Sequence, residues 1–191
     1  ASPSSRVVIG GVHVTFTPHQ TLKECPWIDI VVRGEGERPM LQLAEGMPVE
    51  KIKGISYRKG DEIIDNPPGD FLDPNEIPLP AYDMLDMTKY AYVVLMCTRG
   101  CPYECSFCEL PSLHGRKIRF RSAKQVSDEL ELALSLNPKL EIRYEDEFMG
   151  LDMKRTSEIL EVIKNKNAGQ FRVATRPDGL NEEVLKKLKA T

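Results

Sequence analysis

The sequence contains no long apolar run, little excess charge of either sign and few aromatic residues. No stretch approaches the roughly eighteen apolar residues of a membrane-spanning helix, and mean hydropathy is −0.34, so we expect a soluble protein with no membrane partner. Lys and Arg number 26 and Asp and Glu 29, which excludes a polyanion-binding surface over the whole chain and argues against a nucleic-acid partner. An apolar fraction of 41% in 191 residues argues against disorder.

Cysteine is scarce and odd in number. The chain has five cysteines, and three of them, Cys101, Cys105 and Cys108, fall in one short segment. This spacing favours a metal site over a disulfide framework, so we expect a reducing, cytoplasmic setting. The N-terminus lacks the features of a secretory signal and has no initiator Met, and we expect the chain to start inside a longer protein.

Alternating strand and helix patterns predict an α/β fold. In residues 1–48, the order is a buried strand at Val7 to Ile9, a helix from Pro18 to about Glu24, a strand at Ile28 to Val32 and a helix at Pro39 to Ala44. This order is typical of a three-layer α/β domain with a parallel sheet. Residues 49–86 show a hairpin signal and then a proline-rich stretch, where we place the inter-domain linker.

Residues 87–191 carry a strand followed by a helix three times. Predicted strands cover Tyr92 to Met96, Leu140 to Tyr144 and Phe171 to Thr175, and predicted helices cover Ser122 to Leu136, Asp152 to Lys164 and a last segment capped by Asn181. Such a repeat predicts a second parallel sheet covered by helices.

The segment from Arg99 to Cys108 carries the chemistry. It places three thiols in one loop directly after a predicted strand, with the aromatic Phe107 before the last cysteine. Three soft ligands in a loop indicate an iron–sulfur cluster or zinc. Three cysteines can hold only three irons of a cubane cluster, which leaves the fourth iron open to a chelating ligand.

This C-x-x-x-C-x-x-C loop, between a strand and a helix, resembles the cluster loop of the radical S-adenosylmethionine (SAM) superfamily. The resemblance implies a 4Fe-4S cluster on Cys101, Cys105 and Cys108, with SAM on the open iron. It also implies cleavage of SAM to methionine and a 5′-deoxyadenosyl radical, and an electron donor such as flavodoxin or ferredoxin. In such a family the cofactor carries the chemistry and the protein positions it.

The flanking residues resemble the branch of that superfamily that has an N-terminal cobalamin-binding domain. The run Val8-Ile9-Gly10-Gly11-Val12-His13 resembles the glycine turn where backbone passes close to the nucleotide tail of cobalamin. The branch implies cobalamin as a further cofactor and the methylation or rearrangement of a small-molecule substrate. Its axial-histidine segment would lie before residue 1, and only three of six usual β/α units of the partial barrel are present. We therefore expect a fragment that is inactive alone.

Several site residues have two interpretations. Phe107 either packs in the loop or lies beside the SAM adenine, and Gly10 and Gly11 form either a cobalamin contact or only a tight turn. Asp146, at the end of a parallel strand, either holds the SAM amino group or is a solvated carboxylate. Arg176 either pairs with the SAM carboxylate or lies on the surface.

Alternatives also exist for the whole loop. A zinc site would use His114 or Cys97 as a fourth ligand, in a binding module with no enzymatic activity. A radical SAM methylthiotransferase acting on transfer RNA shares the cluster loop. Such an enzyme would need further cluster cysteines in residues 1–90, where only Cys25 occurs, which counts against this alternative. Arg116, Arg119 and Arg121 form a basic group that is interpreted as a solvated strand face, with contact to an anionic substrate as the alternative.

Overall fold

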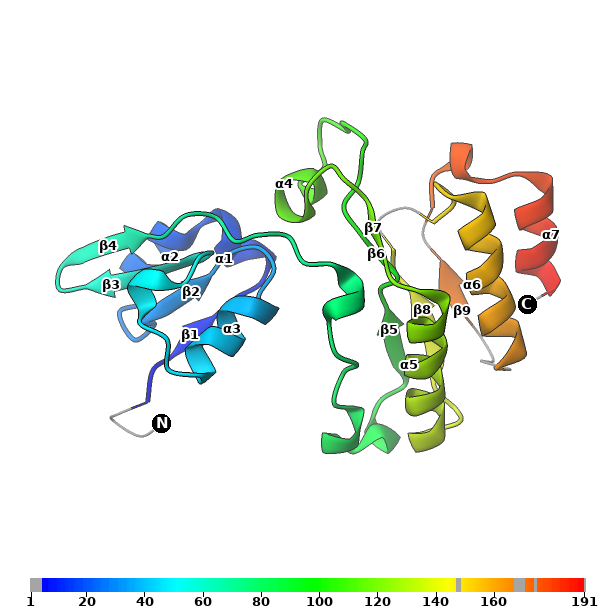
Figure 1. The fold of residues 1–191 in the computed structure, drawn as a ribbon, viewed down its shortest axis with the longest axis horizontal. Helices are drawn as coiled ribbons and strands as arrows, with labels where there is room; N and C mark the ends of the chain where they lie inside the picture. The colour runs from blue at the N-terminus through cyan, green and yellow to red at the C-terminus, as the bar shows by residue number, and fades with distance from the viewer. Residues whose placement is uncertain (1–4, 147–148, 167–170, 174, 191) are drawn as a thin grey trace. The chain divides into compact units, whose positions relative to one another are not determined.

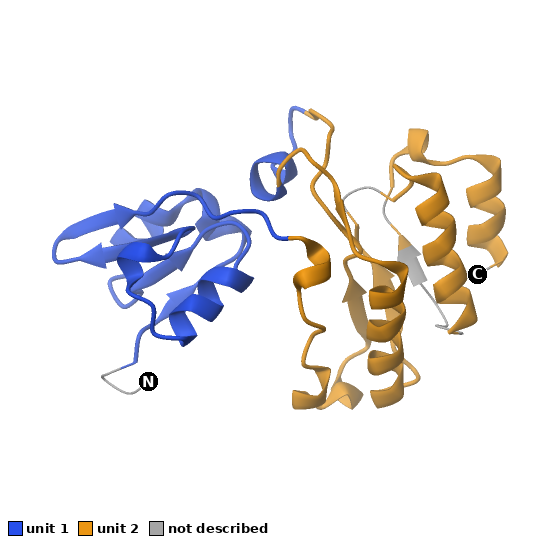
Figure 2. Ribbon diagram, viewed as in Figure 1, with its two compact units in different colours: residues 1–72, 106–114 blue, residues 73–105, 115–191 orange. Residues whose placement is uncertain are grey.

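The computed structural model describes residues 5–146, 149–166, 171–173 and 175–190. The chain divides into two compact units, coloured separately in Figure 2. Unit 1 comprises Ala1–Leu72 and Ser106–His114, and unit 2 comprises Asp73–Cys105 and Gly115–Thr191. Each unit has its own sheet and its own buried apolar residues.

Unit 1 is a four-stranded sheet with helices on both faces (Figure 1). Its elements are β1 (Val8–Ile9), α1 (Val12–Phe16), α2 (Pro18–Glu24), β2 (Ile30–Val32), α3 (Glu37–Ala44), a 3-10 turn (Val49–Lys51), β3 (Ile55–Lys59), β4 (Glu62–Asp65) and α4 (Leu110–His114). In β2, Ile30 and Val32 share a cluster with Leu43 of α3, whereas Val31 packs with Leu22 of α2. This alternation of faces confirms the predicted three-layer α/β fold.

The pairing in unit 1 differs in part from the predicted parallel sheet. β1 and β2 are parallel, as predicted, but β2, β3 and β4 are antiparallel, with Ile30 opposite Tyr57 and Val32 opposite Ile55. The hairpin therefore continues the sheet of unit 1, which extends to Leu72, instead of belonging with the linker. The physical reason is that β3 begins with three buried residues, Ile55, Ser56 and Tyr57, which need a partner on the open side of β2.

Helix α2 begins at Pro18, as predicted, but Thr17 does not cap it with its side chain. The Thr17 hydroxyl donates instead to the His13 carbonyl oxygen at 2.9 Å, at the end of α1. Sequence patterns did not predict α1, because its five residues are mostly β-branched or aromatic and have low intrinsic helix propensity. Gly11 directly precedes the helix, and its φ of 110° favours glycine.

Unit 2 contains a parallel sheet in the order β5-β8-β9, with helices packed on it (Figure 1). The elements are β5 (Tyr92–Leu95), β6 (Thr98–Arg99), β7 (Arg119–Phe120), α5 (Ala123–Leu136), β8 (Glu141–Tyr144), α6 (Met153–Asn165), β9 (Phe171–Val173) and α7 (Glu182–Ala190), with 3-10 turns at Pro74–Glu76, Tyr82–Met84, Met87–Lys89 and Pro177–Gly179. The three predicted strand–helix units are thus confirmed. The two-residue strands β6 and β7 form a separate antiparallel ribbon that is too short to leave a sequence pattern.

Three helices of unit 2 begin at side chains that cap their free N–H groups. Ser122, Asp152 and Asn181 accept hydrogen bonds from the backbone nitrogen atoms of Gln125, Arg155 and Val184 at 3.2, 3.0 and 2.8 Å, respectively. Each such cap is typically worth about 1 kcal/mol. These caps place the starts of α5, α6 and α7 within one residue of their predicted positions. Across the described residues, no helix combines the length and the apolar character needed to cross a membrane.

Candidate functional site

The cysteine loop leaves unit 2 from the β6–β7 ribbon. Thr98 lies opposite Phe120 and Arg99 opposite Arg119, and the Cys101 N–H donates to the Gly115 carbonyl oxygen at 3.1 Å. Gly100 has a φ of +91°, and a Cβ atom there would lie 2.3 Å from the Lys117 carbonyl oxygen. Glycine tolerates this positive φ and has no Cβ atom to clash with the carbonyl oxygen. Gly100 therefore holds the backbone before Cys101 in one conformation.

The three loop cysteines are free thiols. Cys101 is buried, whereas Cys105 and Cys108 are half-buried. Cys101 and Cys105 belong to unit 2, and Cys108 lies in the segment Ser106–His114 of unit 1. Among the residues that the structure describes, no three His, Cys, Asp or Glu side chains converge on a point that could hold a metal ion. The donor set of three thiols in one loop fits an iron–sulfur cluster chemically, and the ligand set stays a prediction.

Arg176 lies beside the cysteine loop. Its Nη1 atom is 3.5 Å from the Cys105 sulfur atom, and its guanidinium carbon lies 4.0 Å from the centroid of the Tyr103 ring. Two further N–H groups donate to the two carboxylate oxygens of Asp178, both at 2.9 Å, and this hydrogen bonding lowers the pKa of Asp178. The structure therefore brings Arg176 and Cys105 together. The sequence analysis assigned Cys105 to the cluster and Arg176 to the SAM carboxylate, without predicting a direct contact.

Asp146 is buried, with 4% of its surface exposed. Its Oδ1 atom accepts hydrogen bonds from the backbone N–H groups of Cys97 and Thr98 at 2.5 and 2.9 Å. Burial raises the pKa of Asp146 from its usual value, while the Tyr144 hydroxyl and these N–H groups oppose that rise. Its Oδ2 atom is buried and accepts no well-aligned hydrogen bond. The interpretation of Asp146 as a solvated carboxylate is therefore wrong, and the neighbouring Glu147 and Phe148 lie outside the described residues.

The other predicted cofactor contacts occupy turns. Phe107 is 88% exposed, so it does not pack within its loop. Gly10 follows β1, and a Cβ atom there would lie 3.6 Å from the Val32 carbonyl oxygen, an ordinary contact distance. Gly11 adopts a positive φ and has open space around it. Both glycines lie at the carboxyl end of β1, the edge where ligands of open α/β sheets bind.

The expectation of a solvated basic group is wrong for Arg121. Its side chain is buried, and Nη1 lies 2.5 Å from a carboxylate oxygen of Glu129 on α5. Arg116, by contrast, is exposed and pairs with Glu104 at 2.5 Å. The sequence did contain a signal for the buried pair. Glu129 falls on the same helix face as the buried Val126, Leu130 and Ala133, where a charged residue needs a partner.

His114, the alternative zinc ligand, lies within unit 1. Its Nδ1 atom is 3.4 Å from an oxygen of Glu35, whose other oxygen accepts the Leu72 N–H at 2.9 Å. Cys97, the other alternative, is fully buried, and burial raises the pKa of its thiol. Cys97 is therefore a core thiol.

Comparisons with known proteins agree with this architecture. No protein-family model matches the chain. The chain is 37% identical over 194 aligned residues to an uncharacterized methyltransferase of Pyrococcus horikoshii, which covers 96% of this chain and 42% of the relative. It is also 30% identical over 145 residues to the cobalamin-dependent radical SAM methyltransferase TokK of Streptomyces tokunonensis, covering 68% of this chain and 21% of that protein.

A solved structure has the same fold. The radical SAM methyltransferase TsrM of Kitasatospora setae, solved with cobalamin and a [4Fe-4S] cluster bound, matches 98% of this chain with a TM-score of 0.75 and 20% identity. This match covers 40% of the TsrM chain, and the chain described here spans less than half the length of the relatives it matches. Together with the three-cysteine loop, these similarities show that the chain belongs to the radical SAM superfamily, in the branch with an N-terminal cobalamin-binding domain.

Proposed function

We propose that the protein is a radical SAM enzyme that methylates or rearranges an unreactive carbon of a small-molecule substrate with the help of cobalamin. The observation that carries this proposal is the loop with Cys101, Cys105 and Cys108, in a chain whose relatives include a cobalamin-dependent radical SAM methyltransferase. An electron donor such as flavodoxin or ferredoxin belongs to the same proposal, as does a reducing, cytoplasmic setting.

The three cysteines would hold the cluster through their thiolates. When bound, the cluster supplies the electron that cleaves SAM and so generates a 5′-deoxyadenosyl radical. The chain supports this role by fixing the loop entry, since Gly100 and the Cys101 N–H are held against Lys117 and Gly115. The Arg176 guanidinium lies beside the Cys105 sulfur atom and would place a positive charge next to the negatively charged cluster.

Three further residues are proposed to bind SAM. Asp146 would accept the SAM amino group through Oδ2, because Oδ1 is already occupied by two backbone N–H groups. Arg176 would pair with the SAM carboxylate through the planar fork that now faces Asp178. The exposed ring of Phe107 would cover the adenine.

Gly10 and Gly11 are proposed to contact cobalamin. A ligand can approach the backbone closely at glycine, and Gly11 has no heavy atom within 4 Å of the place where a Cβ atom would stand. Both residues lie at the carboxyl end of β1, beside the parallel strand β2. This placement supports the contact with the nucleotide tail that the family resemblance implies.

The proposal is tested by reconstituting the protein without oxygen and measuring iron, sulfide and zinc, together with the electron paramagnetic resonance (EPR) spectrum of the reduced cluster before and after SAM is added. We expect about four iron and four sulfide per chain and a spectrum that changes with SAM. Serine at Cys101, Cys105 or Cys108 should abolish that change, and in the full-length parent protein it should abolish the cleavage of SAM.

Cys25→Ala is the matched control, because Cys25 is a half-buried free thiol outside the loop. This variant should assemble the cluster as the unchanged protein does. About one zinc per chain without sulfide would refute the proposal and favour a zinc-binding module. SAM cleavage that persists when any of the three serine substitutions is made in the full-length parent protein would also refute the ligand assignment.

A further inference from the structure

The backbone at residues 96–98 is held by charged side chains. Met96 and Cys97 connect β5 to β6, which begins at Thr98 and belongs to a different sheet. The Arg121 backbone N–H donates to the Cys97 carbonyl oxygen at 2.9 Å, and charged side chains add further contacts to this connection. The Met96 carbonyl oxygen accepts from Arg121 Nη1 at 3.1 Å, and the Cys97 carbonyl oxygen accepts from Arg155 Nη2 at 3.1 Å. Asp146 accepts from the N–H groups of Cys97 and Thr98.

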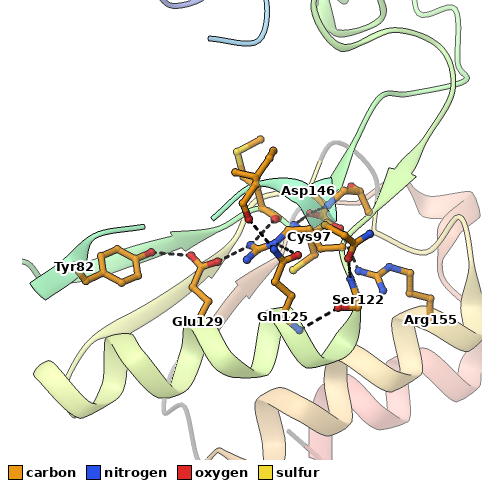
Figure 3. Close-up of polar contacts among 12 residues, drawn as sticks. Tyr82, Cys97, Ser122, Gln125, Glu129, Asp146 and Arg155 are labelled. Carbon is orange, nitrogen blue, oxygen red and sulfur yellow. Dashed lines mark hydrogen bonds and ion pairs between the residues drawn. The ribbon is translucent and has the colours of Figure 1, made fainter. Parts of the chain in front are cut away.

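These four contacts join three charged side chains to the backbone of three successive residues. Figure 3 shows Asp146 beside Cys97, with Arg155 on the same side of the close-up. Asp146 follows β8, Arg121 precedes α5 and Arg155 lies in α6, so three separate segments meet at one bend of the chain. Hydrogen bonds to charged groups are stronger than those between neutral groups.

A second layer holds Arg121 in place. Glu129 pairs with Arg121 at 2.5 Å. The Tyr82 hydroxyl donates to Glu129 of α5 at 2.8 Å (Figure 3). Gln125 accepts from Arg121 Nε at 3.2 Å and donates to the Ile77 carbonyl oxygen at 2.8 Å. Arg121, Glu129 and Asp146 are buried and Arg155 is half-buried, so the network contains two positive and two negative side chains.

Such a network is costly to maintain. Buried ion pairs recover their desolvation cost only when geometry and hydrogen bonding are good, and apolar replacements are often as stable. Stability alone is therefore a weak reason for these charges, whereas fixing one backbone geometry is a use that apolar side chains cannot serve.

The bend lies directly before the cysteine loop. Only Arg99 and Gly100 separate Thr98 from Cys101, so the bend and the first cysteine are at most about 11 Å apart along the chain. The path between them is fixed at Gly100 by the Lys117 carbonyl oxygen. A shift of residues 96–98 would therefore move Cys101 as well, because the short segment between them is not free to adjust.

We propose that Arg121, Arg155 and Asp146 form a charged clamp on residues 96–98, and that Arg121 and Arg155 are positioning residues for the cluster loop. The clamp itself is independent of any cofactor, and its effect on the cluster rests on the proposed function. Without the clamp, Cys101 would sample several positions, and the cluster would be held less uniformly for SAM.

The first test measures amide hydrogen exchange of peptides covering residues 95–101 in the metal-free protein. Arg121→Met and Arg155→Met should each raise exchange at Cys97 and Thr98 about tenfold, because the opened bend exposes these N–H groups more often. Lys154→Met is the matched control, since Lys154 is the exposed neighbour of Arg155 on α6. It should leave exchange unchanged.

The second test compares the reconstituted proteins at equal iron content. The two arginine variants should lose at least half of the EPR change that SAM induces, and Arg155→Lys should restore part of it. If exchange stays as in the unchanged protein, the clamp does not exist. If exchange rises but the SAM-induced change is full, the positioning role is overturned.

These outcomes separate the clamp from the proposed function. A protein that assembles no cluster in its unchanged form contradicts the proposed function, and the exchange measurement still decides whether the clamp exists. If either methionine variant does not fold, Arg155→Lys decides alone. Exchange at Cys97 should then rise about threefold, and an unchanged rate overturns the proposal.

Discussion

The Nη1 atom of Arg176 lies 3.5 Å from the sulfur atom of Cys105, so a fixed positive charge stands next to one of the three thiols of the loop. Tyr103 and Asp178 hold the guanidinium in place, through a ring contact at 4.0 Å and two hydrogen bonds of 2.9 Å. Hydrogen bonds to cluster sulfur atoms and nearby positive charge favour the reduced cluster, which carries one more electron.

Arg176→Gln should therefore lower the reduction potential of the reconstituted cluster. We expect a shift on the order of 60 mV, equivalent to a tenfold change for a one-electron couple. The measurement is a redox titration followed by EPR. Arg143→Gln is the control, because Arg143 also contacts one tyrosine ring and one carboxylate, those of Tyr92 and Glu141, within the same unit. Equal potentials in the two variants would contradict a role for Arg176.

Gly100→Ala should destabilise unit 2 and reduce cluster assembly. Alanine at a positive φ costs about 1 to 2 kcal/mol, and the clash with the Lys117 carbonyl oxygen adds to that cost. Gly60→Ala is the control, because Gly60 has a φ of +61° but nothing within 4 Å of the added Cβ atom. Urea unfolding should show a larger loss for Gly100→Ala, and equal losses would exclude the clash as a cause.

The sequence predicted the regular parts of this fold because they depend on local patterns. Helix α5 has a cap at Ser122 and an apolar stripe, and both features act within the helix itself. The ribbon of β6 and β7 and the burial of Arg121 depend on contacts between distant segments, which leave no periodic pattern. Asp146 was found by its place after a strand, but its two backbone N–H partners come from residues 48 and 49 positions away.

Asp146 should make the stability of unit 2 depend on pH. Burial raises its folded-state pKa above the usual 3.8, so its favourable contribution is fully present below that value and is lost as pH rises through the raised pKa. The unfolding free energy of the unchanged protein, relative to Asp146→Asn, should therefore fall as pH increases above 3.8. Urea unfolding at a series of pH values measures this difference.

Asp73→Asn provides a control of opposite sign. A hydrogen bond from the Asn75 backbone lowers the pKa of Asp73, so its contribution is present above 3.8 and is lost as pH falls through the lowered pKa. The two variants should thus give pH slopes of opposite direction. Slopes of the same direction would mean that burial does not control the ionisation of Asp146.

Tyr82 and Glu129 should be energetically coupled through the buried network. Burial and the adjacent carboxylate raise the pKa of Tyr82, so the hydroxyl keeps its proton and donates to Glu129 at 2.8 Å. Tyr82→Phe removes this donor and should cost about 1 to 2 kcal/mol. Glu129→Gln breaks the pair with Arg121, leaves a buried positive charge and should cost about 3 to 5 kcal/mol.

The double variant should cost less than the sum of the two single variants, because the Tyr82 hydroxyl loses a charged partner only once. We expect a coupling energy of about 1 kcal/mol, measured by urea unfolding of all four proteins. The exposed pair Glu182 and Lys186 on α7, 2.7 Å apart, serves as the reference and should couple by no more than about 0.5 kcal/mol. A Tyr82–Glu129 coupling as small as that reference would mean that Tyr82 does not support Glu129, and that the network that holds Arg121 ends at Glu129.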